Sequence, residues 1–173
     1  PTTYEEYIAM LDWSTEQREH PVAFRVPGAV IHGEKPTKDY GILNKYETVQ
    51  KGSGAAIIAL GTFFGMGKQA AELIEKKTGV KPTLINPVYI TGIDEELLES
   101  LKKDHKAVVT LEDGILDGGF GEKIARFYGD SDMRTVNFGL KKEFLDRYDA
   151  NEVLRQNGIT PEQIADRAAE LIK

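Results

Sequence analysis

The chain has 173 residues, of which 40% are hydrophobic and 29% are charged, and its formal net charge is −6. This composition is typical of one globular α/β domain with some additional elements. The acidic balance and the lack of basic stretches interleaved with aromatics argue against a nucleic-acid partner. The longest apolar run, 55–60, is too short to span a membrane. Cysteine is absent, which excludes disulfides and thiolate chemistry and fits a cytoplasmic protein.

The chain opens with a predicted helix over 4–18. Thr3 and Glu6 form a capping box, since a hydroxyl side chain is followed three residues later by a glutamate. Apolar residues then recur at helical spacing. We expect this helix to pack on the main domain through three side chains: Tyr7, Leu11 and Trp13.

A short strand is predicted over 22–26, ended by a proline and a glycine. One helix and one strand cannot enclose a core. We therefore interpret 1–28 as the last helix and strand of a preceding domain, and 29–50 as a linker with an edge strand over 46–50. The chain begins with Pro1 rather than methionine, which favours the same interpretation.

Residues 51–173 form the third unit, in which strands and helices alternate. An open, mostly parallel sheet with helices on both faces follows from this alternation. The fold class predicted is a three-layer α/β/α domain with about five strands. Strands are expected at 55–60, 83–90, 107–111 and 135–138, with helices over 67–78, from 94, over 117–128 and twice more near the end. The predicted helix ends are Gly79 as a left-handed terminator and Asp94, Asp117, Asp149 and Thr160 as caps.

Glycine-rich segments follow two of the predicted strands. The segment 61–67 lacks the spacing of a nucleotide-binding loop and holds two phenylalanines, so a tight turn is favoured over a phosphate site. Glu112 and Asp113 end another strand, before Gly118, Gly119 and Gly121. These acids could perform acid–base or metal chemistry. Helix capping with close packing at the glycines is favoured, and a subunit or domain contact is the next alternative.

Arg25 and the three histidines are the remaining candidates. The planar fork of Arg25 suits phosphate or carboxylate, although a surface ion pair is the simpler interpretation. His20, His32 and His105 lack metal-ligand spacing, and His105 is expected to interact with the carboxyl end of a helix. No serine has the setting of a hydrolase nucleophile.

Several stretches together resemble the 1-deoxy-D-xylulose-5-phosphate synthases. Residues 21–27 are similar to the family's P-x-A-h-R-h-P-R-G strand, and 105–113 are similar to its H-x-x-h-V-T-h-E-E strand. Residues 118–121 match its GGFG motif. Residues 139–144 and 157–164 resemble two later motifs, so the similarity runs through nearly the whole chain in the family's order.

The resemblance implies a thiamine-diphosphate-dependent transferase of isoprenoid biosynthesis, which joins pyruvate to glyceraldehyde 3-phosphate and releases CO2. The family's sites for thiamine diphosphate and Mg2+ lie in upstream domains, so this chain is expected to bind neither and to be inactive alone. Its implied partners are those N-terminal domains and a second copy in a homodimer. Its implied role is a dimer contact, through Glu112 and the glycines, and a wall of the acceptor site through Arg25.

Two family arginines are missing. Gly28 and Val88 occupy the positions of arginines that the family links to the acceptor's phosphate. A divergent member with a different acceptor therefore stays open, as do a 2-oxoacid dehydrogenase β-subunit fragment and a non-catalytic interaction module.

Overall fold

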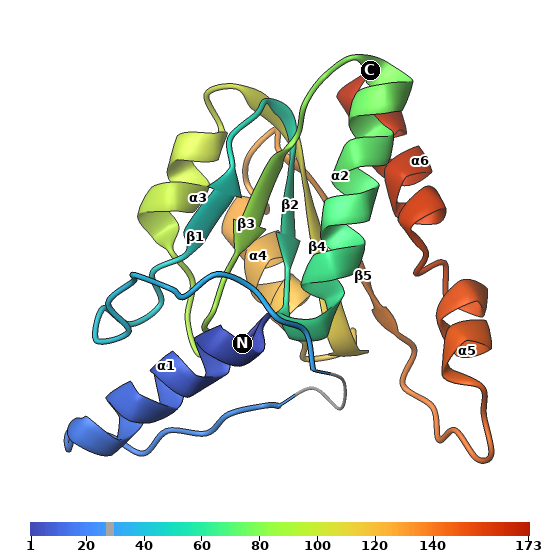
Figure 1. The fold of residues 1–173 in the computed structure, drawn as a ribbon. Helices are drawn as coiled ribbons and strands as arrows, with labels where there is room; N and C mark the ends of the chain where they lie inside the picture. Colours follow the sequence, from blue (N-terminus) through green and yellow to red (C-terminus); the bar gives the residue numbers. More distant parts are fainter. Residues whose placement is uncertain (27–29) are drawn as a thin grey trace.

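The computed structural model describes residues 1–26 and 30–173 and confirms the predicted three-layer architecture. Five strands form one sheet in the order β1-β3-β2-β4-β5, in which only β1 runs antiparallel to its neighbour. Figure 1 shows helices on both faces of this sheet. The strands are β1 (Glu47–Gln50), β2 (Gly54–Ala59), β3 (Thr83–Asn86), β4 (His105–Ile115) and β5 (Arg134–Leu140). The helices are α1 (Tyr4–Glu16), η1 (Gly61–Phe63), α2 (Phe64–Thr78), α3 (Glu95–Leu101), α4 (Phe120–Tyr128), α5 (Ala150–Gln156) and α6 (Pro161–Ile172).

The central strand β2 is buried on both faces, as its continuous apolar sequence predicts. Successive side chains of a strand point to opposite faces. Ile57 therefore packs into the core under α2 and α6, and Ile58 packs into the core under α3 and α4. Both isoleucines are fully buried, and each contributes about 1.5–3 kcal/mol of hydrophobic stabilisation.

Strand β3 is shorter than predicted, because it ends at Asn86 instead of continuing to residue 90. Pro87 has no backbone N–H to donate to a neighbouring strand. The Asn86 side chain accepts a hydrogen bond from the Val88 N–H at 3.1 Å, which turns the chain away. Val88 has a φ of 60°, a left-handed conformation that is strained for a β-branched residue. The local side-chain bond and the proline together override the β propensity of 88–90.

Four of the five predicted helix caps are confirmed. Thr3, Asp94, Asp149 and Thr160 each accept a hydrogen bond from a backbone N–H in the first turn of α1, α3, α5 and α6. Gly79 ends α2 at a φ of 73°, as its sequence position predicts. None of the helices in residues 1–26 and 30–173 is long and apolar enough to cross a membrane.

The opening segment differs from the prediction in two respects. Residues 22–26 do not form a strand, because none of the strands in the described part of the chain pairs with them. Helix α1 does pack on the domain, but its buried residues are Glu6 and Met10. The predicted contacts Tyr7, Leu11 and Trp13 are only half-buried. Of these, Trp13 lies 6.5 Å between ring centroids from the buried Tyr40.

Candidate functional site

The carboxyl ends of β2, β3, β4 and β5 meet at one edge of the sheet, because these four strands are parallel. Helix α1 and the segment after it lie across this edge, at the bottom of Figure 1. The chain connects β2 to β3 on one side and then crosses to β4 on the other. The edge between β2 and β4 is therefore the topological switch point, where open α/β sheets place their ligands.

Arg25, Asp113 and Thr62 come together at this switch point. Arg25 Nη2 lies 3.0 Å from Asp113 Oδ2, and Arg25 also donates to the Asp113 backbone carbonyl. Thr62, which follows β2, donates to the same carboxylate at 3.4 Å. The Arg25 side chain is 71% exposed, so the pair is a surface ion pair, as the simpler interpretation of Arg25 predicts. Such an exposed pair leaves the guanidinium accessible to a competing anion.

Glu112 holds the amino end of α4 against the sheet. Its buried carboxylate accepts hydrogen bonds from the backbone N–H groups of Phe120 at 2.8 Å and Gly121 at 3.0 Å. The prediction that Asp117 caps this helix is wrong: Gly119 is the capping residue, and Asp117 is exposed. A carboxylate from a neighbouring strand can satisfy the free N–H groups as well as a local side chain.

Glycines allow the Glu112 carboxylate and the start of α4 to come this close together. A Cβ atom on Gly119 would collide with the Glu112 carboxylate, and one on Gly121 would lie 2.6 Å from Thr110 Oγ1. Gly118 has a φ of 73°, which favours glycine. The structure thus brings Glu112, Gly119 and Gly121 into one contact, and this geometry directs the carboxylate at the helix rather than at a substrate.

A buried polar contact that sequence patterns missed attaches α1 to the sheet. The Glu6 carboxylate is 4% exposed, and Asn86 Nδ2 donates to it at 3.1 Å. The N–H and hydroxyl of Thr2 also donate to Glu6, at 2.6 Å and 2.9 Å. The sequence signal was an asparagine directly after the apolar Leu84 and Ile85, since Glu6 matched a capping box.

The segment 61–67 forms a tight turn, which is the structure that the sequence favours over a phosphate-binding loop. Gly61 adopts a φ of 49°, and η1 leads directly into α2. A Cβ atom on Gly67 would lie 2.8 Å from the Ala59 side chain, so glycine allows α2 to pack closely on β2. Phe63 is buried beside this turn and belongs to the core under α2 and α6.

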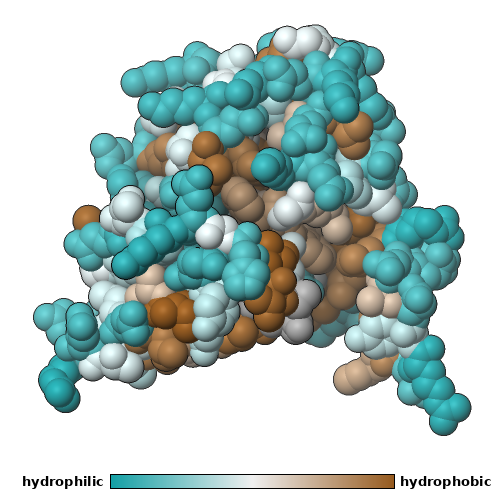
Figure 2. Space-filling model, in the orientation of Figure 1, coloured by the Kyte–Doolittle hydropathy of each residue, from teal (hydrophilic) through white to brown (hydrophobic). Residues whose placement is uncertain are grey.

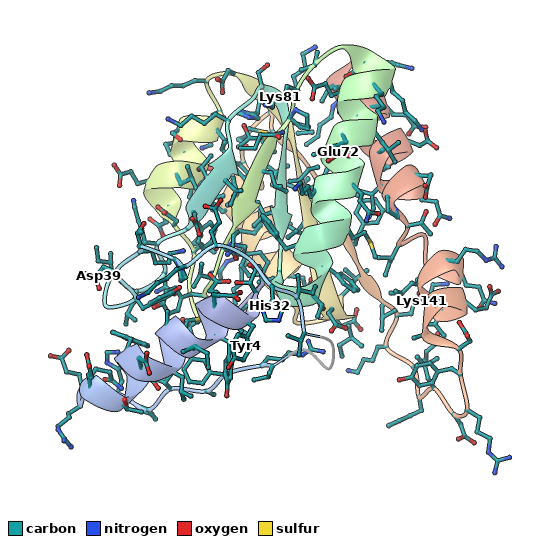
Figure 3. The ribbon with its side chains drawn as sticks, viewed as in Figure 1. Tyr4, His32, Asp39, Glu72, Lys81 and Lys141 are labelled. Carbon is teal, nitrogen blue, oxygen red and sulfur yellow. The ribbon has the colours of Figure 1, made fainter. Side chains whose placement is uncertain are left out.

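The three histidines lie apart. His105 Nδ1 lies 3.1 Å from the carbonyl of Leu101 at the end of α3, which confirms its predicted place. His32 Nδ1 lies 2.8 Å from Glu5 Oε1, and this hydrogen bond, together with the Gly33 N–H that donates to the same carboxylate, lowers the pKa of Glu5 to about 2. Figure 3 shows His32 beside Tyr4, which precedes that glutamate. No group of three metal-binding side chains occurs within residues 1–26 and 30–173.

Exposed apolar side chains gather around the same carboxyl edge. Figure 2 shows hydrophobic residues along the lower face of the molecule, beside the hollow that separates the projecting segment with α5, at the right, from the rest of the domain. Among the described residues, every large exposed hydrophobic residue except Val49 lies in the opening segment, before β1, at the last residue of β4, or after β3 or β5. These residues are Tyr4, Val26, Val30, Ile31, Ile42, Leu43, Ile90, Ile115, Phe144, Leu145 and Tyr148.

The match to a family model decides the family. The model for the transketolase C-terminal domain matches residues 44–164. The chain belongs to the transketolase C-terminal domain family. Among curated relatives, the 1-deoxy-D-xylulose-5-phosphate synthase of Clostridium perfringens is 32% identical and that of Shouchella clausii is 29% identical, each over 99% of this chain. The chain spans 28% of the length of each of these relatives.

Solved structures agree on the fold. The β4 tetramer of a split gene transketolase, described as inactive, matches with a TM-score of 0.67 and 22% identity, over 86% of this chain and 48% of that chain. A transketolase from Pichia stipitis matches with a TM-score of 0.52 and 21% identity, over 75% of this chain and 18% of that one. The transketolase-type C-terminal fold predicted from the sequence is therefore confirmed.

Proposed function

We propose that this chain is the C-terminal domain of a thiamine-diphosphate-dependent transferase of the 1-deoxy-D-xylulose-5-phosphate synthase type. The observation that carries the proposal is the match of nearly the whole chain to just over a quarter of each synthase. The enzyme would join pyruvate to glyceraldehyde 3-phosphate and release CO2. Thiamine diphosphate and Mg2+ would be held by domains upstream, and residues 1–28 would be the end of the domain before this one.

The first role of the domain is contact with those upstream domains and with a second copy in a dimer. The exposed apolar residues at the carboxyl edge support this role, because an unpartnered patch of this kind is unfavourable in water. Glu112 contributes indirectly: by anchoring α4 it holds the segment 116–121 in one conformation at the same edge.

The second role is to form a wall of the acceptor site through Arg25. Its guanidinium lies at the switch point, where it now binds the Asp113 carboxylate. A phosphate oxygen of the acceptor would replace the carboxylate oxygen as the partner of Arg25, and Asp113, whose side chain is partly exposed, would then be solvated rather than buried without a partner. Asp113 and Thr62 position it in the absence of acceptor.

The test uses the protein that contains this chain, supplied with thiamine diphosphate and Mg2+, and the 173-residue chain alone. We expect the longer protein to form 1-deoxyxylulose 5-phosphate and the isolated chain to form none. Activity of the isolated chain, or no pyruvate consumption by the longer protein, would contradict the proposal. Co-purification with an acyltransferase core would instead indicate the 2-oxoacid dehydrogenase alternative, and an encoded protein without cofactor domains would indicate an interaction module.

Arg25 is tested by comparison with a matched arginine. Arg25→Gln should raise the KM for glyceraldehyde 3-phosphate by about tenfold, because one charged hydrogen-bonding group is lost. It should change the KM for a non-phosphorylated aldehyde little. Arg155 also forms an exposed ion pair, with Glu152 at 2.6 Å, but lies on α5. Arg155→Gln should leave both constants unchanged, and an equal effect of the two substitutions would remove Arg25 from the acceptor wall.

One observation favours a different acceptor as the second candidate function. Val88 lies two residues beyond the carboxyl end of β3, at a position where the family resemblance places an arginine, and its N–H donates to the Asn86 side chain. The other missing arginine, at Gly28, lies outside the described residues. If the holoenzyme turns over an uncharged aldehyde as efficiently as glyceraldehyde 3-phosphate, this second candidate replaces the first.

A further inference from the structure

The opposite edge of the sheet carries a cavity that the proposed function does not use. It has a volume of about 600 Å3 and lies between the starts of β4 and β5 and the ends of α3 and α6. This edge is the one that bears the carboxyl terminus, at the top of Figure 1, far from α1. A volume of this size suits a small metabolite.

The cavity is basic in an acidic protein. Four cationic side chains line it, Lys102, Lys106, Arg134 and Lys173, against the side-chain carboxylate of Asp132 and the α-carboxylate that Lys173 carries in the 173-residue chain. The whole chain has a net charge of −6, so this is a local reversal of sign. Concentrated positive charge at a concave surface raises the local concentration of anions.

Two of the cations have local partners. Lys102 lies 2.6 Å from the Glu99 carboxylate, and Lys106 donates to the Ile172 carbonyl at 3.2 Å, at the end of α6. Cations at helix carboxyl ends are expected for structural reasons alone. These two lysines are therefore accounted for by the ends of α3 and α6, and they add positive charge to the cavity.

Arg134 does not interact with the carboxyl end of a helix in this way. It begins β5, is exposed, and forms no ion pair with any residue in 1–26 or 30–173. Its guanidinium borders the cavity, whose floor includes the nearly buried side chains of Met133 and Leu171. A planar guanidinium without a carboxylate partner, backed by lysines, is suited to bidentate binding of a phosphate group.

We propose that this cavity binds a small anion of the phosphate class, with Arg134 as its principal contact. The cation excess favours a multivalent anion over a monocarboxylate, and the apolar floor accommodates an organic portion of the ligand. The site lies at the other edge of the sheet from Arg25, so it is separate from the acceptor wall and does not depend on the proposed function.

The test is calorimetric titration of the 173-residue chain with inorganic diphosphate and, in a second arm, with acetate at matched ionic strength. We expect saturable binding of one diphosphate per chain and no saturable binding of acetate. Arg134→Gln should raise the Kd for diphosphate by about tenfold or more. The matched control is Lys68→Gln, which removes one exposed positive charge on α2, outside the cavity, and should leave the Kd unchanged.

Three results would overturn the proposal: no saturable binding of diphosphate, equal weakening by the two substitutions, or binding of acetate as tight as that of diphosphate. Arg134 is exposed, so its substitution should not unfold the domain. Unchanged circular dichroism and melting temperature would establish this before the titration is interpreted.

Discussion

Replacing Glu112 with alanine would leave two backbone N–H groups at the start of α4 without their acceptor. Each is now bonded to a buried carboxylate, at 2.8 Å and 3.0 Å. A hydrogen bond to a charged group is worth about 1.5–3 kcal/mol, and two bonds to one carboxylate are not additive. We therefore expect Glu112→Ala to lower the free energy of unfolding by about 3 kcal/mol. For a chain of this size the melting temperature should fall by about 6–12 °C.

The assay is urea unfolding followed by circular dichroism, combined with amide hydrogen exchange. The exchange rates of the Phe120 and Gly121 amides should increase more than those elsewhere in α4, because these two groups lose their partner. Asp113→Asn is the matched control: it alters the next residue, whose exposed pair with Arg25 contributes at most about 1 kcal/mol. If Glu112→Ala costs no more than Asp113→Asn, or the two amides remain equally protected, Glu112 does not anchor α4.

Three further predictions concern packing, docking and pH. Gly121→Ala should lower the free energy of unfolding in urea by about 1–3 kcal/mol, because the new Cβ would lie 2.6 Å from a threonine oxygen of β4. Gly65→Ala should instead stabilise α2 by about 0.5–1 kcal/mol, because its Cβ would meet no atom within 4 Å. Asn86→Asp should release α1, because it sets a second carboxylate against a buried one, and the fluorescence of the single tryptophan on α1 should shift to the red. His32→Gln should raise the pKa of Glu5 from about 2 toward its usual 4.5 in an NMR titration.

The sign of the pH effect follows from the lowered pKa of Glu5. A carboxylate whose pKa is lower in the folded state contributes stability above its unfolded pKa, and that contribution is lost as the pH falls toward the folded value. The contact between α1 and residues 32–33 should therefore be complete above pH 4.5 and lost as the pH falls to about 2. A Glu5 pKa near 4.5 in the unsubstituted chain would contradict this account, as would unchanged fluorescence in Asn86→Asp.

Local signals in the sequence were sufficient for most of the helix ends. The hydroxyl or carboxylate caps Thr3, Asp94, Asp149 and Thr160 act on residues three positions away, and Gly79 acts through its own φ. Such interactions depend on the immediate neighbours alone, so they survive in the folded chain. The apolar run in β2 was similarly informative, because a strand buried on both faces requires apolar residues at every position.

Residues distant in sequence decided the features that were mispredicted. The free N–H groups at the start of α4 bond to Glu112 rather than to Asp117, and the buried face of α1 is set by the contact of Glu6 with Asn86, 80 residues away. The segment 22–26 has strand-forming residues, but it pairs with no strand among residues 1–26 and 30–173.

By itself, the sequence determined the alternation of strands and helices, the parallel three-layer fold and the family, because these depend on periodicity, local capping and short motifs. Only the tertiary structure decided that Arg25 meets Asp113 at the switch point, and that the cations of α3, β4, β5 and α6 converge at the opposite edge. The physical reason is that strand order, not chain order, sets which strand ends are neighbours, and strand order follows from how the whole sheet packs.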